Sequence, residues 1–479
     1  MKSALKLIAL ALGLVATSYL VAAAFLGFEL LGISKDAKQL VSQIKAGGNV
    51  DAQHWLADAM NKRIASVTND LNDPLWRPLV KHFSKDFQGE SQLLQSLIAV
   101  SPEIAGSGTA KRYLIAVQNN AEARGTGGLI GAFAEIEILN GKITILREGS
   151  NAQLQSLKKI PIAMSAEYMW HYGDDPAIWQ NSNESAHFPY GAKIWLALWE
   201  KQFHEKLDGV IATDPIALSY ALKTIGTVHL ADAEAITAEN VVAKTLSTAY
   251  SRFATDNAAR KKYLVDVMKA VLDKIVAGNF SHLAFIRNLE QPLLEHRMLF
   301  YSAEDVTQKE IEPTLIGGAL SALPDSQIRV SVINTSGNKL DYYIKRSISV
   351  TRSSCKKNQV VTVKVTVTNT LKSDVKLTDY VKGRLDLHAP HGVNGSHGFQ
   401  LNIYGPTGSE VTSALRNVEL SRSPRLYTEL NHPDAAFSID LPKQASETVT
   451  VEFQGGSGAL SLYSQPLVQP DFVQVKDSC

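Results

Sequence analysis

An arginine inside a glycine-rich segment is the first feature of this sequence that could do chemistry. Residues 122–128 read EARGTGG. Glycines let a backbone approach a ligand closely and leave amide N–H groups free to face an anion, while the guanidinium of Arg124 offers a planar fork of donors suited to carboxylate or phosphate. We therefore predict an anion site at Arg124. Its ligand-binding neighbours are Glu122, Gly127 and Gly128; the alternative is a tight connection whose arginine is solvated.

A second group of cations lies further along the chain, between Tyr250 and Lys262. It contains Arg252, Arg260, Lys261 and Lys262, and it falls in a region, 238–277, whose composition is helical. If the helix breaks near Asp256, these cations can converge on one point and bind phosphate. The alternative is a solvated helix face, which is the usual fate of a run of charges.

Two aspartates bracket the apolar strand between them, Asp208 before it and Asp214 after it. Pro215 at the first helical position starts a helix over Ile216–Thr224, and Asp214 is placed to cap that helix. Either aspartate could instead contact a ligand. Gly226 ends the helix and an apolar stretch, 227–230, follows, so the order strand, helix and strand predicts a βαβ unit.

The glycine-rich segment itself lies between two predicted strands. The apolar run Tyr113–Val117 stops at Gln118, where polar amides begin a loop. Asn119 and Asn120 belong to that loop, and they either bind the ligand or cap the loop through their own backbone.

A hairpin follows the glycine-rich segment. Leu129–Leu139 returns as a strand, Asn140-Gly141 forms a two-residue turn because both positions tolerate positive φ, and Lys142–Leu146 pairs back. With an amphipathic helix over Ala192–Phe203, these segments predict a central α/β domain over residues 106–322.

The carboxyl-terminal part, residues 323–479, changes to short alternating strands separated by turn residues, which predicts an immunoglobulin-like β-sandwich. The strand candidates are Gln327–Ile333, Asp341–Val350, Val361–Thr368, Phe399–Tyr404 and Thr448–Phe453. Cys355 and Cys479 can form a disulfide there if this part is extracytoplasmic, or remain two thiols. His388, His391 and His397 have no acidic or histidine partner at helical spacing, so we predict no metal site.

The amino terminus carries Lys2 and Lys6 before an uncharged run, Leu7–Phe28, long enough to span a bilayer as a helix. We predict a single-pass anchor over residues 1–33, with a cytoplasmic amino terminus and an extracytoplasmic body. A cleaved signal peptide is one alternative, and an anchored body left in the cytoplasm is another. Residues 34–105 have helical periodicity and are predicted to form a stalk.

Length and composition fit this division. A chain of 479 residues exceeds one hydrophobic core, and its net charge of +1 gives no reason to expect a nucleic-acid partner. The sequence contains no nucleophile-elbow serine, zinc helix, P-loop or dinucleotide fingerprint, which argues against the commoner hydrolases and nucleotide-dependent enzymes.

Three motifs resemble the bacterial membrane-anchored family catalogued as domain of unknown function 4012. They are YLIAVQNNAEARGTGGLIGAFAEIEILNGKIT, LDGVIATDPIALSYALKTIGTVHL and VINTSGNKLDYYIKRSISV. The resemblance extends from the anchor through nearly the whole chain, and it implies a protein of the bacterial cell envelope. The family label carries no established activity.

A more remote resemblance is to the LytR-CpsA-Psr family, extracytoplasmic phosphotransferases that move glycopolymers from a polyprenyl-pyrophosphate carrier to the cell wall. Arg124 is similar to that family's loop arginine, and the pair Arg147 and Glu148 is similar to its arginine–acid pair. The segment 207–228 is similar to its strand–helix–glycine segment. The segment 250–262 is similar to its tyrosine–arginine helix. The resemblance implies a phosphate clamp made by Arg124, Arg147, Arg252 and Arg260. It also implies magnesium as a cofactor, which the residues themselves leave unidentified.

The sequence departs from that second family at two positions. The aspartate that should follow the loop arginine and hold magnesium is absent, since Gly125 and Thr126 stand there, and Lys262 replaces an arginine. Two hypotheses follow. The protein binds or transfers a phosphate-linked glycopolymer or polyprenyl-pyrophosphate ligand at the membrane, or it is a non-catalytic envelope scaffold that binds surface polysaccharide or protein. Four arginines around one cavity favour the first, and scattered arginines favour the second.

Overall fold

The computed structural model describes residues 35–36, 39–40, 42–43, 46–47, 50–72, 104–320, 326–353, 359–386, 395–416 and 423–478. The chain divides into two compact units, residues 1–111 with 138–143 and residues 112–137 with 144–479. Within the described ranges no helix has both the length and the apolar character that crossing a bilayer requires. The predicted anchor at 7–28 lies outside these ranges, and the anchor and the three boundaries between the four predicted segments stay predictions.

The first unit contains helix α2 (Val50–Asn72), which confirms a helix inside the predicted stalk. Its apolar residues recur at helical spacing and bury Leu56, Met60 and Ile64 against Leu40. Trp55 lies on the opposite side of α2 and is 68% exposed. Residues 73–103 lie outside the described ranges.

The second unit begins with a mixed five-stranded sheet in the order β3-β2-β1-β4-β7. Its strands are β1 (Lys111–Arg124), β2 (Gly127–Leu139), β3 (Lys142–Ser150), β4 (Gly209–Thr213) and β7 (Leu299–Ser302). β1 and β4 are parallel, whereas β4 and β7 are antiparallel. The turn predicted between β2 and β3 is confirmed, with φ of 53° at Asn140 and 76° at Gly141.

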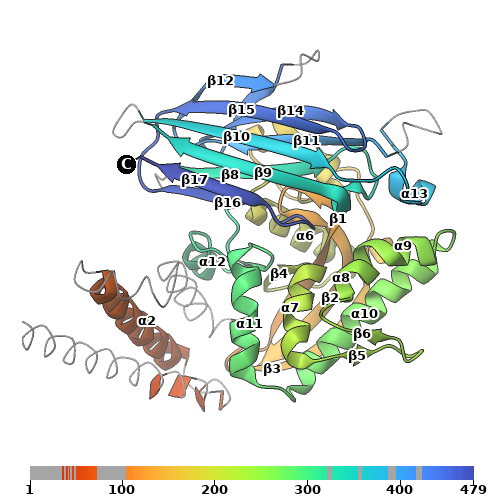
Figure 1. The fold of residues 1–479 in the computed structure, drawn as a ribbon. Helices are drawn as coiled ribbons and strands as arrows, with labels where there is room; N and C mark the ends of the chain where they lie inside the picture. The colour runs from red at the N-terminus through yellow and green to blue at the C-terminus, as the bar shows by residue number, and fades with distance from the viewer. Residues whose placement is uncertain are drawn as a thin grey trace, which may run out of the picture. The chain divides into compact units, whose positions relative to one another are not determined.

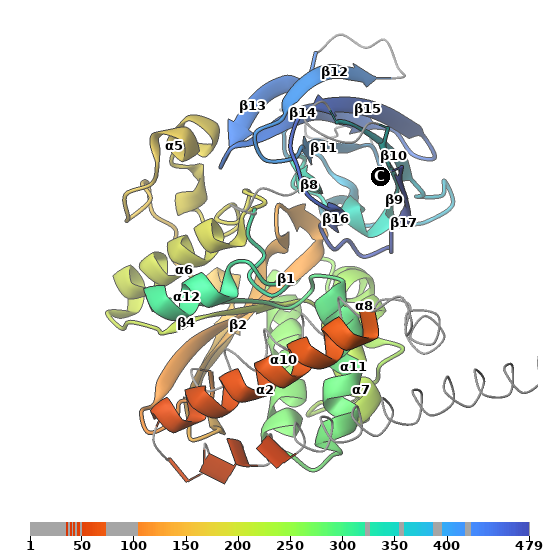
Figure 2. The same ribbon diagram turned by 90° about the vertical axis from the view of Figure 1, so that its left-hand side faces the viewer.

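Helices cover both faces of this sheet (Figures 1 and 2). The helix α6 packs Trp195 and Trp199 against Leu114 of β1 on one face, and α7, α10 and α11 lie on the other. The helices are α5 (Ala166–Tyr172), α6 (Phe188–Phe203), α7 (Pro215–Ile225), α8 (Val241–Ala243), α9 (Ala249–Arg252), α10 (Asn257–Ala277), α11 (His282–Leu294) and α12 (Asp305–Ile311).

The helix α7 forms as its sequence predicts, but the βαβ unit does not. Asp214 caps α7 and accepts a hydrogen bond from the amide of Ala217, and Gly226 ends the helix at a φ of 76°. The strand that follows, β5 (Val228–His229), pairs antiparallel with β6 (Ala235–Ile236) in a separate two-stranded sheet. A run this short has too few apolar side chains to identify its partner.

The helical region 238–277 breaks near Asp256, which was the condition for its cations to converge. After α8 the chain forms a π-helical turn, Lys244–Thr248, and then the short α9. Asp256 accepts a hydrogen bond of 2.8 Å from the amide of Ala259 and so caps α10. Arg252, before the break, pairs with Glu234, whereas Arg260, after it, donates to Asn257.

The carboxyl-terminal part is β-rich, as predicted. Two five-stranded sheets, in the orders β12-β15-β10-β9-β17 and β13-β14-β11-β8-β16, stack over one core that includes Val330, Val363 and Phe437. Their strands are β8 (Ser326–Asn334), β9 (Ile344–Arg352), β10 (Val360–Asn369), β11 (His397–Tyr404), β12 (Glu410–Arg416), β13 (Arg425–Glu429), β14 (His432–Leu441), β15 (Ser446–Gln454), β16 (Leu460–Ser464) and β17 (Phe472–Asp477). A 3-10 turn, Leu340–Tyr343, and the short helix α13 (Asp379–Lys382) lie in its loops.

The register of β17 bears on the predicted disulfide. The strand β17 runs parallel to β9, with Asp477 opposite Arg352, and the Ser478 amide donates to the Arg352 carbonyl at 3.3 Å. Cys355 and Cys479 themselves lie outside the described residues. Since they follow Arg352 and Ser478 by three positions and one position, we expect non-reducing digestion and mass spectrometry to recover one linked peptide containing both. Two separately alkylated cysteines in the untreated protein would contradict this.

Candidate functional site

A cleft of about 210 Å³ lies beside the start of α10, where the α/β sheet meets loops of the sandwich. We call it the cationic cleft, because Arg260, Lys261 and Lys339 line it together with a single carboxylate, that of Glu122. Three positive charges and one negative charge leave it with a net charge of +2. The other polar or aromatic lining residues are Asn119, Asn151, Gln180, Tyr250, Asn257 and Tyr380.

Arg260 is the central cation of this cleft. The residue is only 3% exposed, and its guanidinium carbon lies 4.9 Å from the ring centre of Tyr250 and 4.2 Å from that of Tyr380. One terminal nitrogen donates to Oδ1 of Asn257 at 2.5 Å. Among the described residues, no carboxylate lies within ion-pair distance of it. A buried arginine held by rings and an amide keeps its charge available for an anion.

Lys261 is held in the same manner. Its Nζ donates to Oδ1 of Asn151 at 2.7 Å, and burial, followed by the positive charge of Arg260, lowers the pKa of Lys261. The next residue, Lys262, points away from the cleft and pairs with Asp266 one turn along α10 at 2.7 Å. Two adjacent lysines thus have different environments, and only Lys261 belongs to the cationic cleft.

Lys339 reaches the cleft from the loop between β8 and β9. Burial lowers the pKa of Lys339 to about 8, and its Nζ pairs with Oε2 of Glu122. The neighbouring Asp341 fixes this loop against β1, because its Oδ2 accepts hydrogen bonds from the Ala123 amide at 2.9 Å and from Asn334 at 2.7 Å. Nε2 of His397 donates to the other oxygen of Asp341 at 2.8 Å.

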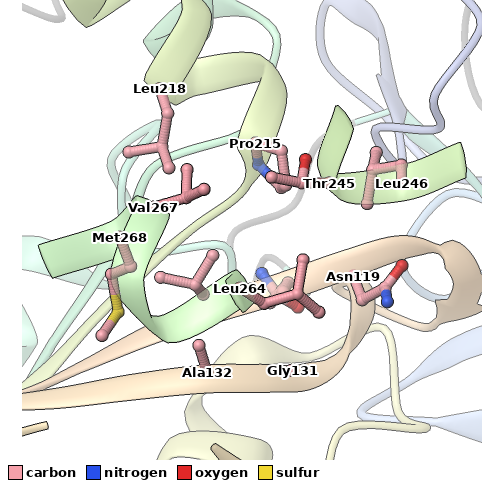
Figure 3. Close-up of a pocket in the computed structure, with 12 residues that line it drawn as sticks. Asn119, Gly131, Ala132, Pro215, Leu218, Thr245, Leu246, Leu264, Val267 and Met268 are labelled. Atoms are coloured by element: carbon pink, nitrogen blue, oxygen red, sulfur yellow. The ribbon is translucent and has the colours of Figure 1, made fainter. Parts of the chain in front are cut away.

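An apolar pocket of about 30 Å³ adjoins the cleft between the sheet and the helices (Figure 3). The two cavities share Asn119, Gly131 and Leu264 in their walls. Leu218, Leu246, Val267 and Met268 are among the apolar side chains that complete the smaller one. A polar cavity that continues into an apolar one suits a ligand with an anionic head and a hydrocarbon chain.

Arg124, the arginine expected to start the site, lies outside the cationic cleft. Its guanidinium is buried and donates to the carbonyls of Gln180 at 2.9 Å and Ala123 at 2.9 Å, and to Oδ1 of Asn181 at 3.1 Å. It also pairs with Glu122 at 3.3 Å. Protein groups occupy its donors, so the prediction that Arg124 clamps a ligand is wrong and its role is to hold the end of the β1–β2 hairpin.

The glycine-rich loop is also much shorter than predicted. The strand β1 continues through Arg124, and only Gly125 and Thr126 form the turn before β2. The side chain of Gln118 accepts from the hydroxyl of Thr126 at 2.9 Å and the amide of Gly128 at 3.3 Å. Gly127 has a φ of 142°, and a Cβ added there would lie 3.3 Å from the same side chain. Because the amide of Gly128 is already bonded to Gln118, the predicted nest of free amides does not form.

The two asparagines of β1 separate. Asn119 lines the cationic cleft and donates to the hydroxyl of Tyr250 at 2.5 Å, which places that ring beside Arg260. Asn120 is fully buried and donates to the carbonyl of Pro466 at 3.1 Å. Asn119 therefore stays a candidate ligand-binding residue, whereas Asn120 joins β1 to the sandwich.

The other two predicted clamp arginines lie elsewhere in the second unit. Arg147 packs its guanidinium 4.2 Å from the ring centre of Phe203 and pairs with Glu135 at 3.3 Å, on the face of the sheet that α6 covers. Arg252 is partly exposed and pairs with Glu234 at 2.5 Å. The predicted arrangement of four arginines around one cavity does not occur, because Arg260 is the only one of the four that lines the cleft.

Asp208 and Asp214 have structural roles. Asp208 accepts from the backbone amide of Arg112 at 2.7 Å and so ties β1 to β4. Asp214 caps α7 through one oxygen and pairs with buried Arg297 at 2.9 Å through the other. The description of Asp214 as a helix cap is thus confirmed, and neither aspartate lines the cationic cleft. Among the described residues, no group of His, Cys, Asp and Glu side chains is arranged to hold a metal ion.

Sequence reasoning found Arg260, Asn119 and Glu122 but missed Lys339 and Tyr380 as members of the site. Both come from the sandwich, and more than 200 positions separate them from β1. Nothing in the local pattern marks them. The sequence contained one signal for which cations belong to the site. This was the expected helix break near Asp256, which separates Arg260 and Lys261 from Arg252.

The comparisons with known proteins support the first resemblance over part of the chain, which includes the first two motifs but not the third. Residues 109–250 match the model of a family described as “Protein of unknown function (DUF4012)”. No curated protein matches the chain. A crystal structure of a candidate nutrient binding protein from Legionella pneumophila aligns at 12% identity over 28% of this chain and 43% of that one, with a TM-score of 0.16. The chain thus spans less than half of that protein's length.

Proposed function

We propose that this protein is an extracytoplasmic, membrane-anchored component of the bacterial cell envelope that binds a phosphate-bearing ligand in the cationic cleft. The observation that carries the proposal is Arg260, a buried guanidinium with an amide partner and two aromatic neighbours in place of a carboxylate. Leaving a buried charge without a counterion is costly. A bound phosphate would supply the missing negative charge and two or more charge-assisted hydrogen bonds.

The adjoining apolar pocket directs the proposal to an amphiphile such as a polyprenyl pyrophosphate, with or without a glycan attached. The pocket's volume of about 30 Å³ admits only the beginning of a hydrocarbon chain. The rest of a polyprenyl chain would lie outside this pocket. The proposal includes a remote relation of the α/β domain to the LytR-CpsA-Psr fold and of the β-sandwich to the immunoglobulin fold.

Binding is a better proposal than transfer. In the LytR-CpsA-Psr resemblance, the loop arginine clamps the phosphates and the aspartate after it helps to hold magnesium. Here Arg124 donates to backbone carbonyls, and Gly125 stands where the aspartate would follow. The non-catalytic alternative is therefore favoured in a modified form, as a protein that holds a phosphate-linked ligand without transferring it.

The proposal predicts a difference between neighbouring cations. For the full-length protein in detergent micelles, we expect Arg260→Ala to weaken the binding of undecaprenyl pyrophosphate by about 10- to 100-fold, since a charge-assisted bond contributes about 1.5–3 kcal/mol. Lys261→Ala should weaken it about tenfold. Lys262→Ala should change the Kd less than twofold, because this side chain pairs with Asp266 outside the cleft. Isothermal titration calorimetry provides the three Kd values.

The matched pair Lys261→Ala and Lys262→Ala removes the same charge from consecutive positions, so a nonspecific effect of net charge would affect both equally. Thermal unfolding of each variant checks that the fold persists. Equal Kd values for the wild type and Arg260→Ala, or equal losses at Lys261 and Lys262, would rule out the cationic cleft as the binding site.

A further inference from the structure

We infer that a second binding site, for a neutral glycan, lies on the outer face of the sandwich beside α5 (Figure 2). Its centre is Trp170, whose side chain is 73% exposed, next to Tyr427 of the edge strand β13. The site is separate from the cationic cleft, shares no residue with it, and does not depend on the function proposed for that cleft. We call it the aromatic platform and define it by Trp170, Tyr427, Gln400 and Arg425.

Trp170 is exposed although its helix is firmly held. On either side of it, α5 buries Tyr168 in the core and places Tyr172 to donate to Glu429 of β13 at 3.1 Å. Glu167 accepts a hydrogen bond of 2.7 Å from the amide of Leu430. Trp170 therefore presents an aromatic face to solvent from a fixed helix, and unlike the equally exposed Trp55 it lies beside a second aromatic ring of another element, Tyr427.

The rings around Trp170 form a shaped surface. The Trp170 ring meets that of Tyr427 edge to face, with centroids 6.3 Å apart and an interplanar angle of 76°. The ring of His171, also on α5, reaches β13. Its centroid lies 4.1 Å from that of Tyr427, and its Nε2 is 2.9 Å from the carbonyl of Thr428. The second ring is thereby fixed, so binding costs little side-chain entropy there.

A chain of side-chain hydrogen bonds borders the rings. Exposed Arg425 donates to Oε1 of Gln400 at 2.8 Å, and Nε2 of Gln400 donates to Oδ1 of Asn402 at 3.0 Å and to the hydroxyl of Tyr427 at 3.2 Å. Asn402 in turn donates to Tyr427 at 3.0 Å and to buried Asp434 at 2.5 Å. The sheet register fixes this row, since Tyr427 lies opposite Asp434, and Asn402 opposite Ala436.

These two features together identify a carbohydrate as the ligand. A sugar ring has an apolar C–H face that packs on an aromatic ring and hydroxyl groups that both donate and accept hydrogen bonds. Gln400, which is partly exposed, carries both an amide N–H group and a carbonyl oxygen at the edge of the rings, whereas Asn402 is buried behind it. No lysine or carboxylate belongs to the platform, and its one cation, Arg425, is exposed to solvent, where a charge contributes little to binding. A neutral glycan is therefore a better fit than a phosphate or an acidic peptide.

The test uses the full-length protein in native gels that contain dextran, laminarin, yeast mannan or arabinogalactan. We expect at least one polysaccharide to retard the wild-type protein. We expect Trp170→Ala to weaken that binding at least tenfold, Gln400→Ala about threefold, and Trp170→Tyr to retain part of it, because a smaller aromatic face remains.

Trp55→Ala is the matched control, since Trp55 is 68% exposed in the first unit and lies on α2; it should bind as the wild type does. Trp170→Ala should unfold at the wild-type temperature, and Trp170→Tyr provides the comparison if it does not. The inference is overturned if none of the four polysaccharides retards the wild type or if Trp170→Ala binds unchanged. It is overturned equally if the substitution alters only self-association in sedimentation velocity, which would make the platform a protein contact.

Discussion

Arg124→Ala is expected to lower the free energy of unfolding by about 3–5 kcal/mol while leaving the affinity of the folded protein for a phosphate ligand within about threefold of the wild type. The reason is the burial of the Arg124 guanidinium among carbonyls of Gln180 and Ala123 and the side chain of Asn181. Truncation leaves these acceptors buried and unpaired. Urea denaturation measures the stability, and calorimetry of the folded variant measures the affinity.

Arg252→Ala provides the control for this prediction. Arg252 is also an arginine in an ion pair, but its side chain is 43% exposed and its partner is Glu234, so its loss should reduce stability by less than about 1 kcal/mol. Arg124→Lys should give an intermediate loss, because the charge remains while the planar fork does not. The opposite result, native stability with lost phosphate binding in Arg124→Ala, would return Arg124 to the ligand site.

The sequence alone correctly predicted the elements that depend on residues close to one another in the chain. Asp214, Pro215 and Gly226 fix α7 through a cap, a preset φ and a left-handed stop. The Asn140-Gly141 turn and the alternating strand β10 are equally local. Each of these signals lies within a few residues of the element it defines.

The sequence failed where polar residues are buried by distant parts of the chain. Residues 118–124 of β1 were expected to form a loop because their side chains are polar, yet they continue the strand. Asp341, Pro466 and Gln465 of the sandwich supply their partners. A single sequence contains no signal for such pairs, which are more than 200 residues apart. For the same reason the sequence suggested that Arg124 and Arg147 bind a ligand, whereas in the structure protein groups bond to them.

The largest pH effect should come from a pair of carboxyl groups buried behind the aromatic platform. Asp434 is fully buried, and burial raises the pKa of its carboxyl to about 8. Its Oδ2 accepts a hydrogen bond from Asn402, and this bond and one from Tyr427 oppose the shift without cancelling it. Burial also raises the pKa of the neighbouring Glu429, although bonds from Ser185, Tyr172 and Tyr404 oppose that shift.

The sign of the effect follows from the two states of Asp434. In the unfolded chain its pKa is close to the ordinary value of 3.8, and in the folded protein it is about 8. Between these values the folded state holds a proton that the unfolded state has lost, so the stability that this group contributes is present at acidic pH and declines as pH rises toward 8. Glu429 has the same sign, since its pKa is also raised.

We therefore expect Asp434→Asn to raise the free energy of unfolding by about 2–4 kcal/mol at pH 8, and to have little effect near pH 4, because an amide resembles the protonated carboxyl and never ionises. The pH dependence of stability between 4 and 8 should flatten, with the remaining slope due to other carboxyl groups of raised pKa, among them Glu429 and Glu184. Asp440→Asn is the control on the same strand, as that side chain is 60% exposed, and should shift stability by less than about 1 kcal/mol. Urea titrations at five pH values distinguish the outcomes: if Asp434→Asn keeps the wild-type slope, Asp434 is ionised in the folded protein and some other group compensates its charge.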